Sequence, residues 1–188
     1  MKIKMQLLSD TIFGNGKSIP GAEDISVLCD EYGFPYFKGG TMKGIFRETL
    51  EEYLSLLGKS ETEADEEVNR LLGTGGIETA SDRLVFSDFV LSENVRQKVI
   101  TEIGPDNQEF VKNLFTNLRT FTSMEDGMAK SGSLRCARCV NQGFFFYSEI
   151  RCLKADEELV RDVLALIKNI GSMRNRGFGN VLISEEEQ

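Results

Sequence analysis

Apolar residues change their spacing along this chain, and that change most restricts the folds it can adopt. In residues 2–9 they recur at every second position, which is the period of a strand with one buried face. In residues 42–57 and 157–170 they recur every three or four positions, which is the period of an amphipathic helix. The two periods together predict an α+β domain in which helices pack on a sheet.

Four further segments have a strand-like composition, and their order predicts the fold. They are residues 83–91, 134–140, 144–152 and 181–184. The Asn-Gln-Gly sequence at 141–143 suits a hairpin turn between the second and the third. We set residues 92–133 aside as an inserted arm. The remaining order predicts a ferredoxin-like βαββαβ core, which carries its helices on one face of an antiparallel sheet.

Polar residues and glycines suggest where the helices begin and end. Thr41 is expected to cap the first helix and Asp156 the last, and Gly58 ends the first. A second, acidic helix is predicted over residues 62–72. Residues 10–40 hold six glycines and two prolines, so they are predicted to form a long loop, and loops of that length are usually functional.

The bulk composition predicts one domain, 1–188, with a core of about 1–91 and 134–184 and an insertion at about 92–133. Of the 188 residues 40% are hydrophobic, which is enough for a core. No apolar run approaches the ~20 residues of a membrane span, and the first residues alternate in polarity, unlike a signal peptide. We therefore expect a cytoplasmic protein without a membrane partner, with its four cysteines reduced.

The charged residues exclude some classes of function. The chain has no histidine, so histidine-based catalysis and histidine metal sites are excluded for this chain alone. Its net charge of −8 argues against a general polyanion binder. However, residues 61–67 and 185–187 hold eight of the 30 acids, so the rest of the chain is balanced at 22 acids and 22 bases. Such a body has room for one local basic groove.

A glycine-rich, cationic loop follows the last helix at 171–181 and is a candidate phosphate site. Gly177 and Gly179 let a backbone approach a ligand closely, and Arg174 and Arg176 offer guanidinium forks. The alternative is a glycine-rich helix end with two solvated arginines. The loop precedes a strand, unlike a Walker A loop, which opens a helix.

A second candidate site lies at the start of the first helix. Gly39 and Gly40 precede that helix, and helix N-termini attract anions. Lys38, Lys43 and Arg47 cluster nearby, the last two on one helix face. The alternative is an ordinary helix start with basic surface residues.

Three motifs in this order resemble the RAMP superfamily of CRISPR effector proteins. They are GFPYFKGGTMKGIFR at 33–47, RLVFSD at 83–88 and GSMRNRGFGNV at 171–181. The nearest pattern is the repeating backbone subunit of type III interference complexes, the Csm-three or Cmr-four type. Lys38 stands where that family often has proline, and Gly40-Thr41 stands for Ser-Ser. The unpatterned region 92–133 falls where the family inserts its thumb.

The resemblance implies a subunit that stacks with copies of itself and with other effector subunits along a guide RNA, and that meets a target RNA. It implies guide-RNA contacts from the helix start and from the glycine-rich loop. The residues concerned are Lys38, Gly39, Gly40, Thr41, Lys43, Arg47, Arg174, Arg176, Gly177 and Gly179.

The same resemblance implies that Asp24 cleaves the target RNA with a divalent cation, such as Mg²⁺. Asp24 and Asp30 match two aspartates of the family loop, although Ser26 stands for its proline. A carboxylate can act as a base or hold the metal. Alternatives are an exposed loop acid in a non-cleaving subunit, a guide-processing RAMP endonuclease, and a small phosphate-ligand enzyme outside the family.

Cysteines and aromatics are assigned structural roles. Cys136 and Cys139 have zinc-knuckle spacing, but residues three apart on a strand point to opposite faces. We favour reduced packing cysteines; the alternative is a structural zinc with Cys29 and Cys152 as its other ligands. The run Phe144, Phe145, Phe146 could stack on bases, but we expect a buried strand beside the core.

Overall fold

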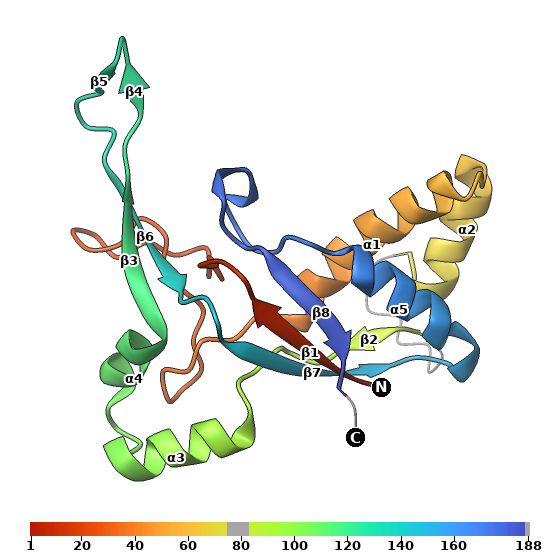
Figure 1. Ribbon diagram of the computed structural model, residues 1–188, viewed down its shortest axis with the longest axis horizontal. Helices are drawn as coiled ribbons and strands as arrows, with labels where there is room; N and C mark the ends of the chain where they lie inside the picture. The colour runs from red at the N-terminus through yellow and green to blue at the C-terminus, as the bar shows by residue number, and fades with distance from the viewer. Residues whose placement is uncertain (75–82, 187–188) are drawn as a thin grey trace.

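The computed structural model describes residues 1–74 and 83–186, and its centre is a four-stranded antiparallel sheet (Figure 1). The strand order is β2-β7-β1-β8. The strands are β1 (Lys2–Leu7), β2 (Val85–Phe86), β7 (Phe145–Arg151) and β8 (Val181–Glu185). This order confirms the ferredoxin-like core. Glu187, at the end of the acidic run, lies outside the described residues.

The period-2 pattern of β1 explains how the sheet is covered. Ile3, Met5 and Leu7 are buried, and Lys2 and Lys4 lie on the opposite, open face. Helices α1 (Gly39–Leu56) and α5 (Glu157–Leu166) pack on the buried face, and α2 (Glu61–Leu72) packs on α1 (Figure 1). In the described part of the chain, no helix is both long and apolar enough to cross a membrane.

Gly58 follows the end of α1 in the left-handed conformation, as expected, but the two expected N-terminal caps make no capping bond. Helix α1 begins at Gly39, so Thr41 lies inside its first turn and caps nothing. Asp156 makes no capping bond either. Instead its buried carboxylate pairs with Arg70 of α2 at 2.7 Å, which ties α5 to α2. Helix α5 also ends four residues early, although Ile167 and Ile170 remain buried as expected.

An arm leaves the sheet after β2 (Figure 1). It comprises helices α3 (Glu93–Ile103) and α4 (Gln108–Phe115) and strands β3 (Thr116–Phe121), β4 (Met124–Glu125), β5 (Met128–Ala129) and β6 (Arg135–Val140). Strands β3 and β6 pair over six residues, and β4 and β5 form the tip. The long ribbon projects well away from the sheet.

The predicted hairpin between the strand at 134–140 and the strand at 144–152 is wrong. Strand β6 pairs with β3, and β7 pairs with β1 and β2, so residues 141–143 carry the chain from the arm into the sheet. Both strands exist, but β6 pairs within the arm and β7 pairs within the main sheet.

Two other strand predictions need correction. The predicted strand 83–91 is regular only at Val85–Phe86 and then continues as single bridges. The three phenylalanines are not all buried: Phe146 is inside, but Phe145 is 38% exposed on the open face, with Lys4 Nζ 5.4 Å from its ring centre.

Candidate nucleic-acid interface

Three segments that are distant in sequence meet at the base of the arm. They are the long loop 10–38, the strands β3 and β6, and the glycine-rich loop 171–179. A second apolar cluster, separate from the main core, joins them; its members are Ile12, Ile25, Phe121, Ala137, Cys139, Met173 and Phe178. The rings of Phe121 and Phe178 contact edge to face, with 5.5 Å between their centroids. The glycine-rich loop is thus held against the arm, while its residues 174–177 are exposed.

A groove of about 400 Å³ lies between the first turns of α1 and the glycine-rich loop. Lys38, Gly40 and Thr41 line one side and Arg174 lines the other. These four predicted RNA-binding residues therefore share one surface, although more than 130 positions separate Thr41 from Arg174. Glu48 is the acid that also lines this groove. We call this surface the α1–loop groove.

Gly39 has a structural role, which corrects its assignment as an RNA ligand. It is buried, and its N–H donates to Asp88 Oδ1 at 2.8 Å, so that amide is already used. A side chain there would overlap the carbonyl oxygens of Phe86 and Ser87. By contrast, an added Cβ at Gly40 or Gly44 would meet nothing within 4 Å. The open glycines are the ones that leave space along α1.

Lys43 and Arg47 lie outside the α1–loop groove. Arg47 Nη2 donates to the carbonyl oxygen of Gly73 at 2.5 Å, at the end of α2. Partial burial lowers the pKa of Lys43, and the nearby positive charges of Arg47 and Arg83 lower it further. These two predicted RNA-binding residues are therefore not among those that line the groove with Arg174.

Arg174 and Arg176 occupy one short 3-10 turn but face different hollows. Arg174 lines the α1–loop groove. Arg176 and Gly177 line a second hollow, which also contains Arg119 of β3, a cation that the sequence pattern did not single out.

Gly177 has φ +81° and open space around it, so it permits the turn. Gly179 is buried, and a side chain there would overlap the carbonyl oxygen of Ile170.

Asp24 lies at the base of the arm, with its side chain 42% exposed. Its Oδ2 accepts the N–H of Cys136 at 2.7 Å, and its Oδ1 accepts from Arg135 Nη1 at 3.3 Å.

Asp30, the second family aspartate, is used internally: Oδ1 accepts the N–H of Tyr32 and Oδ2 pairs with Arg96 at 2.6 Å. Of the two side chains, that of Asp24 is the more exposed, at 42% against 23% for Asp30.

The residues around Asp24 do not themselves form a magnesium site. Its nearest charged partner is a guanidinium, and the described residues contain no group of three or more Cys, Asp or Glu side chains that could hold a metal. Cys136 and Cys139 lie on one strand as expected, and all four cysteines are free thiols.

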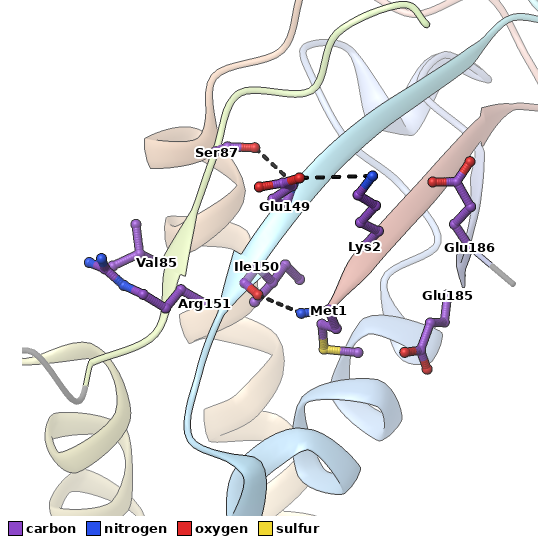
Figure 2. Close-up of a pocket in the computed structure, with 9 residues that line it drawn as sticks. All are labelled: Met1, Lys2, Val85, Ser87, Glu149, Ile150, Arg151, Glu185 and Glu186. Atoms are coloured by element: carbon purple, nitrogen blue, oxygen red, sulfur yellow. Dashed lines mark hydrogen bonds and ion pairs between the residues drawn. The ribbon is translucent and has the colours of Figure 1, made fainter. Parts of the chain in front are cut away.

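Another hollow, of about 1370 Å³, lies at the edge of the open sheet face (Figure 2). Acids and bases alternate along it, and Lys2 pairs with Glu149 at 4.0 Å. No predicted site residue lines it. Its balanced charge distinguishes it from the α1–loop groove.

Comparison with known proteins gives a family and a fold. The model of the RAMP superfamily matches residues 4–181. Among solved structures, 157 chains match. One belongs to the cryo-EM structure of the Type III-B Cmr-beta bound to cognate target RNA, with 12% identity, a TM-score of 0.66 and coverage of 97% of this chain and 95% of that one. Another, from the apo state of Cmr-beta, has 13% identity, a TM-score of 0.69 and the same coverage. No curated protein matches the sequence.

Proposed function

The chain belongs to the RAMP superfamily, and we propose that it is a guide-RNA-binding subunit of a type III CRISPR ribonucleoprotein. The observation that carries the proposal is the α1–loop groove, where the first turns of a helix and a cationic glycine-rich loop share one surface. The similarity in fold to chains of Type III-B Cmr-beta supports it.

The groove suits a ribose-phosphate strand. Arg174 presents a planar guanidinium that can hold two phosphate oxygens, and Lys38 offers a mobile ammonium group. Gly40 and Gly44 carry no side chain, so the strand can approach the helix backbone closely. Arg176 and Arg119 flank the other side of the loop and can contact a second stretch of the same RNA. Copies of the subunit would bind successive stretches of guide.

Cleavage of a paired target RNA by Asp24 is the second part of the proposal. The half-exposed carboxylate can accept the proton of a ribose 2′-hydroxyl, and Arg135 beside it can stabilise negative charge on the phosphate. The resemblance also implies that the thumb, here the long arm, displaces a nucleotide of the paired strand at regular intervals, and that displacement would supply the in-line geometry. A non-cleaving, purely structural subunit remains the competing function.

The test of RNA binding uses the chain co-expressed with the subunits encoded beside it. We expect RNA to co-purify and to be lost in part from an Arg174→Ala variant. Arg151→Ala, at the hollow of Figure 2, is the matched control and should retain RNA. Equal RNA content in both variants would contradict guide binding in the groove. Binding of free nucleotides without RNA would favour a small phosphate-ligand enzyme.

The test of cleavage uses Asp24→Asn in the same complex, because asparagine keeps an acceptor for the N–H of Cys136. We expect loss of target cleavage at regular steps with unchanged RNA binding. If the Asp24→Asn complex still cleaved the target, cleavage by Asp24 would be contradicted and the non-cleaving, structural function would be favoured.

A further inference from the structure

The segment that carries Asp24 is built into the arm as an additional strand. Ile25 pairs in parallel with Ala137 of β6. The N–H of Asp24 donates to the carbonyl oxygen of Cys136 at 2.7 Å, and the N–H of Arg138 donates to that of Ile25 at 3.0 Å. The backbone at 24–25 therefore extends the β3–β6 ribbon, and this short stretch of loop 10–38 belongs to the arm.

A buried ion pair fastens this added strand from behind. Glu23 is 3% exposed and Arg138 is 7% exposed. Arg138 Nε donates to Glu23 Oε1 at 2.5 Å, and its Nη1 donates to Asn113 Oδ1 at 2.8 Å and to Thr116 Oγ1 at 3.0 Å. Lys112 Nζ lies 3.9 Å from the same Glu23 oxygen. The pair thus joins the loop to β6, and through Arg138 to α4 and β3.

This arrangement is costly if its only purpose is packing. The second oxygen of Glu23 is buried with no hydrogen-bond partner among the described residues. Burying a charge costs free energy unless its partners compensate fully, and an apolar pair of similar volume often stabilises as well or better. What an ion pair adds is direction, because its hydrogen bonds form in one register only.

We propose that Glu23 and Arg138 are a positioning pair that fixes Asp24 relative to the arm. The proposal rests on the proposed cleavage by Asp24. Glu23 is adjacent to Asp24 in sequence and faces the interior, so it acts through the backbone and touches no RNA. Because loop and arm are hydrogen-bonded as one ribbon, an arm that displaces a nucleotide, as the resemblance implies, would also carry the carboxylate to the bond beside it.

Two variants and a control test the pair. Glu23→Gln keeps the shape and removes the charge. The double variant Glu23→Leu/Arg138→Met replaces the pair by apolar groups and guards against a simple folding failure. Glu149→Gln is the control, since Glu149 pairs with Lys2 at 4.0 Å on the open face of the main sheet, outside the arm.

Hydrogen exchange of residues 22–27 and the mapping of cleavage products are measured on the assembled complex. In both pair variants we expect faster exchange of that segment, a kcat lowered about tenfold or more, an unchanged KM, and cuts displaced from their regular positions. The control variant should match the unmodified chain in exchange rate, kcat, KM and cut positions.

The outcomes separate the two proposals. If Asp24→Asn still cleaves, the cleavage proposal fails, and exchange alone decides whether the pair fastens the loop. Unchanged exchange in Glu23→Gln overturns the positioning pair. Faster exchange with unchanged kcat and cut positions, while Asp24→Asn is inactive, also overturns it. So does a double variant that cuts at the original positions and rate.

Discussion

The carboxylate of Asp88 accepts a hydrogen bond from the N–H of Gly39 at 2.8 Å, across 49 positions of the chain. Asp88 ends the segment RLVFSD, and Gly39 begins α1. Two motifs that look independent in the sequence are therefore one structural unit. Asp88 takes the place of the missing N-cap side chain, and Gly39 allows the strand backbone to pass close to the helix start.

Gly39→Ala should destabilise the fold. The new methyl group would overlap the carbonyl oxygens of Phe86 and Ser87, and overpacking of this kind costs about 1–3 kcal/mol. Gly40→Ala is the control, because its methyl group has open space and alanine favours helix by up to ~1 kcal/mol. Urea unfolding of both variants measures the difference. Equal free energies of unfolding for the two variants would show that the close approach of the Phe86 and Ser87 carbonyls does not require glycine at position 39.

Asp88→Ala should weaken the start of α1. It removes the acceptor for the N–H of Gly39, and loss of a helix cap costs about 0.5–2 kcal/mol. Asp88→Asn retains an acceptor and should lose less. The comparison again uses the free energy of unfolding, and a larger loss in Asp88→Asn than in Asp88→Ala would contradict the capping role.

Arg174 and Arg176 should each contribute to the salt dependence of RNA binding. Because they face different hollows, the double alanine variant should lose both contributions, about 0.7 per phosphate contact in the slope of log K against log salt. Arg151→Ala should leave the slope unchanged. The measurement is a salt titration of guide-RNA affinity, and an unchanged slope in the double variant would count against both contacts.

Asp10 should make the protein sensitive to acid. Burial opposes ionisation of its carboxyl, but Arg119, the N–H of Gln142 and Asn117 together lower its pKa below the ordinary 3.8. A carboxyl whose pKa is lower in the folded than in the unfolded protein stabilises the folded state at pH values above its unfolded pKa. That stabilisation is lost as the pH falls below about 4. Asp10→Asn should therefore lose less stability than the unmodified chain between pH 5 and pH 3. Parallel urea titrations at the two pH values measure this, and identical losses would refute it.

Cys29 and Cys139 should resist alkylation in the folded protein. Burial raises the pKa of each thiol to about 12, so almost no thiolate is present at pH 8. Mass spectrometry after iodoacetamide treatment, with and without denaturant, should detect their modification only on unfolding. Rapid labelling of either cysteine in the native protein would contradict the burial.

Local pattern was sufficient for several elements. The alternation at 2–9 predicted β1, and helical spacing predicted α1 and α5 within a few residues, because these periods reflect burial of one face of each element. The acidic helix predicted at 62–72 is α2. The loop 10–40 was also predicted from its glycines and prolines. The resemblance of three motifs identified the family, and the family model confirms it. The same resemblance indicated an inserted thumb at 92–133.

The sequence by itself thus determined β1 and the helices α1, α2 and α5, the ferredoxin-like order, and the two segments that line the α1–loop groove. Only the tertiary structure decided that β6 pairs with β3, that Asp156 meets Arg70, and that Lys43 lies apart from Arg174. It also decided that Asp24 sits on the arm. The reason is physical: a periodic pattern reports which face of an element is buried, whereas strand partners, buried ion pairs and shared grooves depend on residues that come together only when the chain has folded.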